Sequence, residues 1–389
     1  MLKLAIVSTH PIQYNAPLFK MLNKRAVITI KVFYTWSQSE NGLKFDPGFG
    51  ENIKWDIPLL DGYDYHFSEN VSKQPGSNHT KGIINPNLNK EVEAWGANAL
   101  LIYGWNFIGH QCAINYFYRK IPILFRGDST LLDEQYGLKK ILRRLYLKFI
   151  YRKVGIAMYA GTANKAYFKA HGFKEEKLFF MPHAIENERF FKNELLIKKS
   201  SLFRNEIGIE KDDLVFLFAG KLDNNKNITL LLNVFESIES EAHLLVAGSG
   251  LLLNELITKY KHNNRIHFLG FQNQEKMPVV YAASNVFILP SKSETWGLSI
   301  NEAMAANNAI IVSDKCGASF DLVKNNENGF VVKTNDSGSL QNAMQVCIRN
   351  SEKVIYFGND SFNKVKHYSF ENDCTILEKV ILETCKNKI

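Results

Sequence analysis

The residues that point most directly to chemistry are two glutamates, eight positions apart, in the stretch SKSETWGLSINEAMA (291–305). Glu294 lies on a loop before Gly297, and Glu302 lies about one turn inside a helix that we expect to begin near Leu298. The first amides of a helix have no partner within it and lie at the positive end of its dipole. The stretch therefore predicts an anion site flanked by carboxylates that can bind hydroxyl groups, although two such glutamates standing alone would fit an ordinary surface.

Two lysines form a second candidate phosphate element. The segment FAGKLDNNKN (218–227) places Lys221 directly after Gly220 and Lys226 just before the helix-like run ITLLLNVFESI. Two ammonium groups at a helix N-terminus could neutralise a diphosphate and stabilise the charge that it gains on leaving. A third turn, AGSG at 247–250, permits close backbone approach at Gly248, but this signal fits a purely structural turn equally well.

These motifs follow short strand-like runs, which alternate with amphipathic stretches through most of the chain. This alternation is typical of parallel sheets wrapped by helices, so we predict two doubly wound α/β domains. Ligands of such sheets bind at the carboxyl ends of the strands, and two sheets that face one another would place a site in the cleft between them. The runs cover 2–8, 27–35, 99–104, 121–127, 154–161 and 177–184 in the first half, and 213–220, 242–248, 265–270, 285–291, 308–314 and 328–333 in the second.

Length and composition agree with this organisation. The 389 residues predict two domains or three, and with 46% hydrophobic and 22% charged residues the chain excludes disordered and collagen-like classes. We place the first domain at 1–192, the second at 193–365 and a terminal helix at 366–389, with an apolar stripe of Ile376, Leu377, Val380 and Ile381. The segment 35–91 is expected to form long loops.

The cysteines and the apolar segments indicate where the protein works. The five cysteines are scattered and never form C-x-x-C, which argues against a disulfide framework and against a zinc site. No stretch approaches the roughly 18 to 20 apolar residues of a spanning helix, and the N-terminus lacks the pattern of a signal peptide. We therefore expect a cytoplasmic protein, with the inner face of the plasma membrane as a peripheral location.

The net charge of +8 predicts an anionic partner, and much of it is concentrated in one segment. Residues Lys139 to Lys153 carry seven Lys or Arg and no acid, with apolar residues at helical spacing. In one interpretation the apolar face docks on its own domain and the basic face is solvated. In the other, this helix lies against anionic lipid. Nucleic acid is not expected, because no recognition motif accompanies the charge.

Several of these segments, taken in order, resemble those of a known family. The segments FAGKL, LLVAGSG, IHFLGF, YAASNVFILPSKSETWGLSINEAMA and NGFVV follow one another as in the nucleotide-sugar domain of the retaining glycosyltransferases of family 4. That resemblance covers about 215–332, and HPIQYNAPLF (10–19) is similar to an opening in members that build bacterial surface glycans. It implies the GT-B fold: two Rossmann-like domains that face a central cleft, with a terminal helix that crosses back to the first.

The family resemblance also implies roles for single residues. Glu294 would contact hydroxyls of the transferred sugar, Glu302 the ribose, and Lys221 with Lys226 the diphosphate. Lys221 stands where the family usually has Arg, which loses a bidentate fork but keeps the charge. The remaining donor contacts would be made by the backbone amides of Thr295, Trp296, Gly297 and Leu298 to the distal phosphate, and by Gly248, Gly270 and Phe271 along the donor, the last two near its base.

Three residues of the first domain are further catalytic candidates beside Glu294, Lys226 and Lys221. His10 follows the first strand, where a side chain can reach the cleft, and Pro11 makes the turn rigid. Arg126 and Asp128 end another strand, at a place where the family often has a polar residue next to the reacting sugar. An ordinary turn histidine and a salt-bridged pair are the structural alternatives. His183 replaces a usual Asn in a segment that we interpret as a hinge.

From these residues and the resemblance we expect a hexosyl- or N-acetylhexosaminyltransferase. It would move a sugar from a nucleoside diphosphate sugar to a hydroxyl of a growing, lipid-linked surface polysaccharide, capsule or lipopolysaccharide, with retention at the anomeric carbon. We expect no metal or other cofactor, because no D-x-D motif stands in the required context and the lysines can supply the positive charge. A nucleotide-sugar epimerase of the same architecture and a non-catalytic glycan-binding protein are the alternatives.

Overall fold

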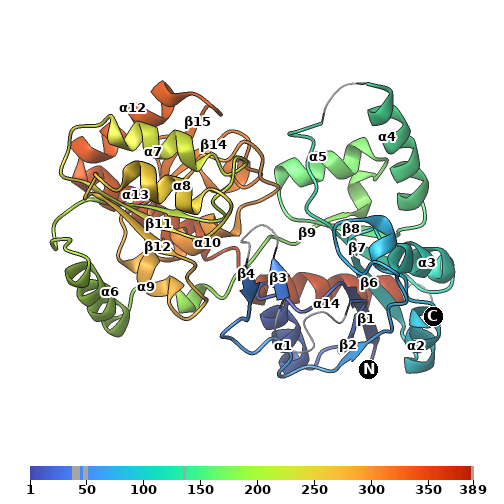
Figure 1. Cartoon of the computed structure of the whole chain (residues 1–389). Coiled ribbons are helices and arrows are strands. Elements are labelled where there is room, and N and C mark those ends of the chain that lie inside the picture. The colour runs from blue at the N-terminus through green and yellow to red at the C-terminus, as the bar shows by residue number, and fades with distance from the viewer. Residues whose placement is uncertain (37–43, 47–50, 135–136, 387–389) are drawn as a thin grey trace. The chain divides into compact units, whose positions relative to one another are not determined.

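The computed structural model describes residues 1–36, 44–46, 51–134 and 137–386, and side chains throughout these ranges except in 44–46 and 51–53. The chain divides into two compact units (Figure 1). The first unit comprises Met1–Lys44, Ile57–Pro182 and Phe370–Ile389, and the second comprises Phe45–Asp56 and His183–Ser369. The unit boundaries therefore fall after Pro182 and before Phe370, and a short segment from the first half of the chain belongs to the second unit.

The first unit is built on a sheet of seven strands in the order β5-β2-β1-β6-β7-β8-β9. Every strand pair in it is parallel, and the central strand β1 buries Leu4 to Val7 completely, as expected for a strand covered on both faces. The strands are β1 (Lys3–Ser8), β2 (Thr29–Tyr34), β5 (Tyr65–Phe67), β6 (Ala99–Tyr103), β7 (Ile123–Arg126), β8 (Ile156–Tyr159) and β9 (Leu178–Phe180).

Six of these strands coincide with the predicted runs, and β5 is additional. It lies in the segment that the sequence analysis assigns to loops, because three residues at a sheet edge leave no periodic signal. The same segment contains the short pair β3 (Lys44–Asp46) and β4 (Glu51–Ile53). The helices of the first unit are α1 (Ala16–Arg25), α2 (Leu88–Trp95), α3 (Ile108–Phe117), α4 (Leu138–Tyr151), α5 (Thr162–Ala170) and α14 (Phe370–Lys386), with 3-10 turns at Thr80–Gly82 and Glu175–Lys177.

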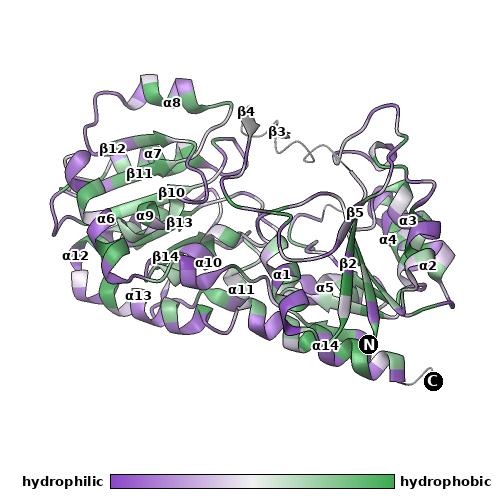
Figure 2. Cartoon of the chain, turned by 90° about the horizontal axis from the view of Figure 1, so that it is seen from below, coloured by the Kyte–Doolittle hydropathy of each residue, from purple (hydrophilic) through white to green (hydrophobic). Residues whose placement is uncertain are grey.

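The second unit has a sheet of six parallel strands in the order β12-β11-β10-β13-β14-β15. The strands match the six predicted runs, and Figure 2 shows the sheet mostly in the hydrophobic colour. They are β10 (Val215–Ala219), β11 (His243–Ala247), β12 (Ile266–Gly270), β13 (Val286–Leu289), β14 (Ala309–Ser313) and β15 (Gly329–Val332). The helices are α6 (Glu194–Glu206), α7 (Ile228–Glu236), α8 (Leu253–Tyr260), α9 (Met277–Ala282), α10 (Leu298–Ala305), α11 (Ser319–Leu322), α12 (Ser337–Arg349) and α13 (Ser351–Val365), with a 3-10 turn at Asn187–Arg189.

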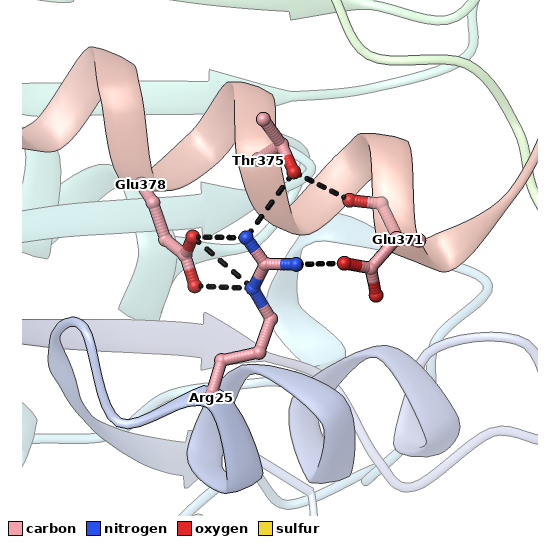
Figure 3. A network of polar contacts seen from close by, with 4 residues as sticks. All are labelled: Arg25, Glu371, Thr375 and Glu378. Atoms are coloured by element: carbon pink, nitrogen blue, oxygen red, sulfur yellow. Dashed lines mark hydrogen bonds and ion pairs between the residues drawn. The ribbon is translucent and has the colours of Figure 1, made fainter.

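The C-terminal helix α14 packs on α1 in the first unit. Its predicted stripe points inward, since Leu377, Val380 and Ile381 are buried. Arg25, the last residue of α1, holds the helix from the side (Figure 3). Its guanidinium donates from Nε and Nη2 to the Glu378 carboxylate at 2.9 and 2.8 Å and also bonds Glu371. These carboxylates raise the pKa of Arg25, with the Glu378 hydrogen bonds contributing most.

Replacing Arg25 by Met should weaken the docking of α14. The change leaves the buried Glu378 carboxylate without its cation. We expect the free energy of unfolding to fall by about 2 kcal/mol, less than for a fully buried pair, because Arg25 itself is one-quarter exposed. Urea denaturation should show this loss, and Lys24→Met on the same helix should not. A double variant in which Glu378 is also Met should recover part of it, and an unchanged denaturation midpoint for Arg25→Met would contradict the assignment.

Two histidines, the buried His110 and the partly buried His267, should make the fold sensitive to acid. Burial lowers the pKa of His110 to about 4, and burial with the nearby His243 lowers that of His267 to about 4. Between about pH 6.5 and 4 the unfolded chain therefore binds more protons than the folded chain. The contribution of these histidines to the free energy of unfolding should be fully present above this pH window and should be lost as the pH falls through it.

Thermal unfolding between pH 7 and 4 measures this effect. His267→Gln keeps a polar partner for His243 and should flatten the decline, whereas His262→Gln controls for the loss of an exposed imidazole from the same unit. A decline that stays equally steep in His267→Gln would show that this histidine is not one of the groups that bind protons.

Candidate functional site

The topology of the second unit gathers most of the predicted donor residues at one edge of its sheet. Strands β12, β11, β10 and β13 are neighbours in that order, and all are parallel. The loops that follow them therefore lie side by side at the carboxyl edge, with the change in strand order between β10 and β13. Those loops carry the predicted donor residues at Gly270–Phe271, Gly248, Lys221–Lys226 and Glu294–Leu298.

The loops after β10 and β13 are joined by charge and by hydrogen bonds. Lys226 Nζ forms an ion pair with Glu294 Oε2, and both side chains are mostly buried. Asn225 reinforces the junction, since its Nδ2 donates to Ser293 O at 2.8 Å and its carbonyl accepts from Lys292 N at 2.7 Å. Two residues that are 68 positions apart thus meet at one point of the sheet edge. The predicted phosphate lysine and sugar carboxylate belong to one site.

The Glu294 loop is fixed from behind by the segment after β14. Glu294 N donates to Lys315 O at 3.0 Å, and Gly317 N donates to Glu294 O at 2.9 Å. A Cβ at Gly317 would lie 1.9 Å from Thr295 O, so only glycine permits this approach. Burial raises the pKa of the neighbouring Cys316 thiol to about 12, so that it stays protonated and does not act as a nucleophile.

Helix α10 begins at Leu298, where the sequence predicts it, and presents its N-terminus beside Glu294. Its N-cap is Gly297 in the left-handed region at φ 97°, which has no side chain to cap the first amides. The Trp296 indole is buried and donates from Nε1 to Asn301 Oδ1 at 2.9 Å, so it anchors the loop. Only the backbone of Trp296 is left to serve a ligand, which agrees with the role that the resemblance implies.

Glu302 lies deeper than its predicted partner. It is buried, and its Oε2 accepts a hydrogen bond from the Tyr281 hydroxyl at 2.7 Å. Tyr281 comes from α9 and carried no signal in the sequence, because a tyrosine in an apolar run is ordinary core material. The ribose contact of Glu302 stays a prediction, and the structure adds Tyr281 as the residue that orients it.

The glycines of the AGSG turn have a structural reason. Gly248 N donates to Gly270 O at 2.8 Å, and a Cβ at Gly248 would lie 1.9 Å from Gly220 O. Leu222 N donates to Ser249 O at 2.9 Å on the other side of the turn. The turn therefore holds the backbone next to Lys221 against the ends of β11 and β12. Its contact with a ligand stays a prediction.

A segment from the first half of the chain lies over the end of β12. Asn273 Nδ2 donates to Lys54 O at 2.7 Å, and the Trp55 ring lies 6.5 Å from the Phe271 ring. The sequence predicts only long loops for this segment. It covers the place where the resemblance puts the base of the nucleotide. The sequence did not predict this contact, because Lys54 and Asn273 are more than 200 positions apart.

The first unit carries the other three candidates. His10 follows β1, bonds the Thr9 hydroxyl through Nδ1 at 3.0 Å and packs edge-on against Trp36. Asp128 is exposed just after β7. Arg126 is buried, and its Nη2 donates to Pro182 O at 3.1 Å while Nη1 donates to Met181 O. Its guanidinium thus connects the end of β7 to the chain after β9. The catalytic role of Arg126 stays a prediction.

Asp128 also borders a cavity of about 160 Å³ in the first unit. Aromatic rings form much of its wall, among them Trp105, Phe125 and Tyr151. His183, which we interpret as part of a hinge, is the first residue of the second unit after Pro182, and its carbonyl accepts from Asn301 Nδ2 at 3.0 Å. The sequence predicted neither the cavity nor the contact between His183 and Asn301, because both depend on which elements pack together.

The described residues include neither a candidate metal cluster nor a candidate membrane-spanning helix. Within 1–36, 44–46, 51–134 and 137–386, no cluster of three or more His, Cys, Asp or Glu side chains is arranged to hold a metal ion. In the same parts of the chain, no helix combines the length and the apolar character needed to cross a bilayer.

Gly248→Ala should damage both the fold and the site of the second unit. Gly248 has φ 146°, where an L side chain is strained, and the new Cβ would collide with Gly220 O. We expect a loss of about 2 kcal/mol or more and weaker nucleotide binding, measured by thermal unfolding and calorimetry. Gly155→Ala, whose Cβ would make one ordinary contact at 3.5 Å, is the control and should change neither.

Known proteins resemble part of this chain in sequence. Residues 199–363 match the family model described as glycosyl transferases group 1. An uncharacterized glycosyltransferase of Methanocaldococcus jannaschii is 32% identical over 134 residues, which are 33% of this chain and 34% of the relative. An Escherichia coli UDP-Gal:alpha-D-GlcNAc-diphosphoundecaprenol alpha-1,3-galactosyltransferase is 31% identical over 142 residues, 34% of this chain and 36% of the relative. The chain thus spans about a third of the length of these curated relatives.

Solved structures match nearly the whole chain. The Anabaena protein HepE in complex with UDP and glucose has a TM-score of 0.73 at 16% identity, covering 98% of this chain and 100% of that one. Sucrose-phosphate synthase from Thermosynechococcus elongatus has a TM-score of 0.73 at 17% identity, covering 98% and 99%. The predicted fold class, two doubly wound α/β domains of the GT-B type, is confirmed. Residues 199–363 thus match the model of the group 1 glycosyl transferases, within a chain of GT-B fold.

Proposed function

We propose that the protein is a retaining glycosyltransferase that moves a sugar from a nucleoside diphosphate sugar to a hydroxyl of a growing, lipid-linked surface glycan. The observation that carries this proposal is the Lys226–Glu294 ion pair beside the glycine-capped N-terminus of α10. It unites a cation for phosphate, a carboxylate for sugar hydroxyls and the positive end of a helix dipole at the carboxyl edge of one sheet. The matching family model over residues 199–363 supports the same chemistry.

The charges of the site suit a diphosphate. Without a ligand, Lys226 and Glu294 neutralise each other, which limits the cost of holding both in a half-buried place. A diphosphate can replace Glu294 as the partner of Lys226 and can also bind Lys221, while the α10 amides contact its distal phosphate. Glu294 then becomes available to accept hydrogen bonds from the sugar. Donor binding thus exchanges an internal ion pair for contacts with both halves of the ligand.

The same groups can assist the reaction. The bond from the anomeric carbon to the phosphate oxygen breaks, and its electron pair stays with the leaving diphosphate. Lys221, Lys226 and the α10 amides stabilise the negative charge that develops there, and they need no reorganisation to do so. The acceptor hydroxyl forms its bond to the same face of the short-lived oxocarbenium-like centre and gives its proton to the leaving phosphate. This sequence needs neither a protein nucleophile nor a divalent metal.

The relatives point to the class of acceptor. The Escherichia coli relative is named for a diphosphoundecaprenol-linked substrate, and a Campylobacter jejuni relative, 24% identical over 160 residues, is named for another. An O-antigen chain mannosyltransferase and a lipopolysaccharide core mannosyltransferase are also similar to this chain. We extend this common theme to the present protein as a lipid-linked glycan acceptor. The base and the sugar of the donor stay open, including the choice between a hexose and an N-acetylhexosamine.

Glu294→Ala tests the donor site. Turnover should fall at least about 100-fold, because the sugar loses its hydroxyl acceptor and Lys226 loses its positioning partner. Nucleotide binding should largely survive, since the lysines and the helix amides remain. Calorimetry with UDP, GDP, ADP and dTDP sugars selects the donor, and transfer assays with that donor measure turnover. Glu241→Ala, an exposed glutamate outside these loops, is the matched control.

The outcomes separate the alternatives. Undiminished turnover in Glu294→Ala would overturn the donor-site assignment. An epimerised sugar formed from donor alone would identify a nucleotide-sugar epimerase, and nucleotide-sugar binding without any turnover would leave a glycan-binding protein. Retention is checked by determining the anomeric configuration of the product.

A further inference from the structure

Helix α4 docks on the first unit by the face opposite to its main apolar stripe. Leu147, Ile150 and Tyr151 point inward and are buried. Six large apolar side chains instead point outward, with exposures between 46% and 80%. We call them the outward stripe: Leu138, Ile141, Leu142, Leu145, Tyr146 and Phe149. The interpretation in which the main apolar face docks on its own domain is therefore wrong, and Ile150 belongs to the docked face.

The outward stripe is continuous and follows the whole helix. Its members stand at intervals of three and four residues, so each lies next to the following one along the helix surface. A single exposed leucine is ordinary, but a contiguous apolar patch of this extent marks an interaction surface. The docked face, with Leu147, Ile150 and Tyr151, supplies the buried contacts of α4, whereas the stripe is exposed to solvent.

Basic side chains border the stripe on both sides. By helical spacing, Lys139 lies at one edge of the stripe and Lys148 at the other. Arg152 lies beside Ile141 at the second edge, Arg143 lies beyond Lys139, and all four basic residues are exposed. Two further basic residues, Lys140 and Arg144, lie toward the docked face, where both bond Glu134. The outward face thus combines an apolar stripe with a rim of exposed basic residues.

We propose that α4 is a membrane-docking helix that lies in the surface of an anionic bilayer, with the outward stripe among the acyl chains and the basic rim on lipid headgroups. An apolar stripe with flanking Lys and Arg is the pattern that binds in this way. A second copy of the chain fits less well, because stripe-to-stripe packing would bring two basic rims together. Nucleic acid would use the charges but would leave the leucines in water.

The outward stripe leads to the aromatic cavity of the first unit. The Tyr146 ring lies 6.0 Å from the Trp105 ring, and Trp105 lines the cavity. Tyr151, on the docked face of α4, lines it as well, and Asp128 lies at its border. If the proposed function holds, an acceptor that stays anchored in the bilayer would reach this cavity along the outward stripe. The inference rests on the proposed function only in this last step.

Sedimentation of the full-length protein with vesicles tests the docking. Vesicles of phosphatidylglycerol and phosphatidylcholine should bind the protein, and pure phosphatidylcholine should bind it much less. The double variant Leu142→Glu, Leu145→Glu should weaken binding at least tenfold. The double variant Arg143→Gln, Lys148→Gln should weaken vesicle binding by a similar factor, at about fivefold per basic residue. High salt should also weaken vesicle binding, because it screens the charges. Leu202→Glu, an exposed leucine of α6 in the second unit, is the control and should bind as the wild type does.

Thermal unfolding confirms that each variant is folded. Equal vesicle binding by the wild type and the Leu142→Glu, Leu145→Glu variant would overturn the proposal. So would a wild-type dimer, seen by analytical ultracentrifugation, that this variant abolishes, because the stripe would then be an interface between copies.

A second measurement separates this inference from the proposed function. Brominated lipids should quench tryptophan fluorescence in the wild type and less so in Trp105→Phe, whether or not the protein transfers sugar. Membrane binding without any transfer would reject the proposed function and keep the docking surface. Transfer to an acceptor in vesicles that is unchanged by Leu142→Glu, Leu145→Glu would reject a role of the outward stripe in delivering the acceptor.

Discussion

The ion pair between Lys226 and Glu294 is the interaction on which the candidate site depends. Each residue lies on a loop at the carboxyl edge of the second unit's sheet, and the loops meet because β10 and β13 are neighbours there. A half-buried ion pair contributes little net stability, since desolvation offsets its attraction. Its value lies in position: it holds a carboxylate and an ammonium group at the start of α10, where a negative ligand is favoured.

The other features of the second unit support that arrangement. Glycines 248 and 317 allow backbones to approach more closely than any side chain would permit, and buried Trp296 with Asn301 fixes the loop that precedes α10. Tyr281 orients Glu302 from another helix. These residues bind no ligand by themselves in the proposed function. They keep the groups that do so in place before the ligand arrives, and this preorganisation is what electrostatic catalysis requires.

Helix α4 shows how far an amphipathic pattern can be interpreted. The sequence showed an amphipathic basic helix over this segment, but periodicity does not say which side of a helix faces the core. Here three less conspicuous residues, Leu147, Ile150 and Tyr151, form the docked face. The conspicuous stripe points outward, so the helix has two apolar faces, and each one needs a different partner.

The amino-acid sequence by itself determined the strand and helix pattern, the repeated doubly wound architecture, the start of α10 and the identity of the phosphate and sugar candidates. These are local or periodic features, and neighbouring residues encode them. Tertiary structure decided that Lys226 pairs with Glu294, that Arg126 is tied to the carbonyls of Met181 and Pro182, and that Trp55 lies beside Phe271. Such contacts join segments that are distant in the chain, and only the packing of the sheets and helices brings them together.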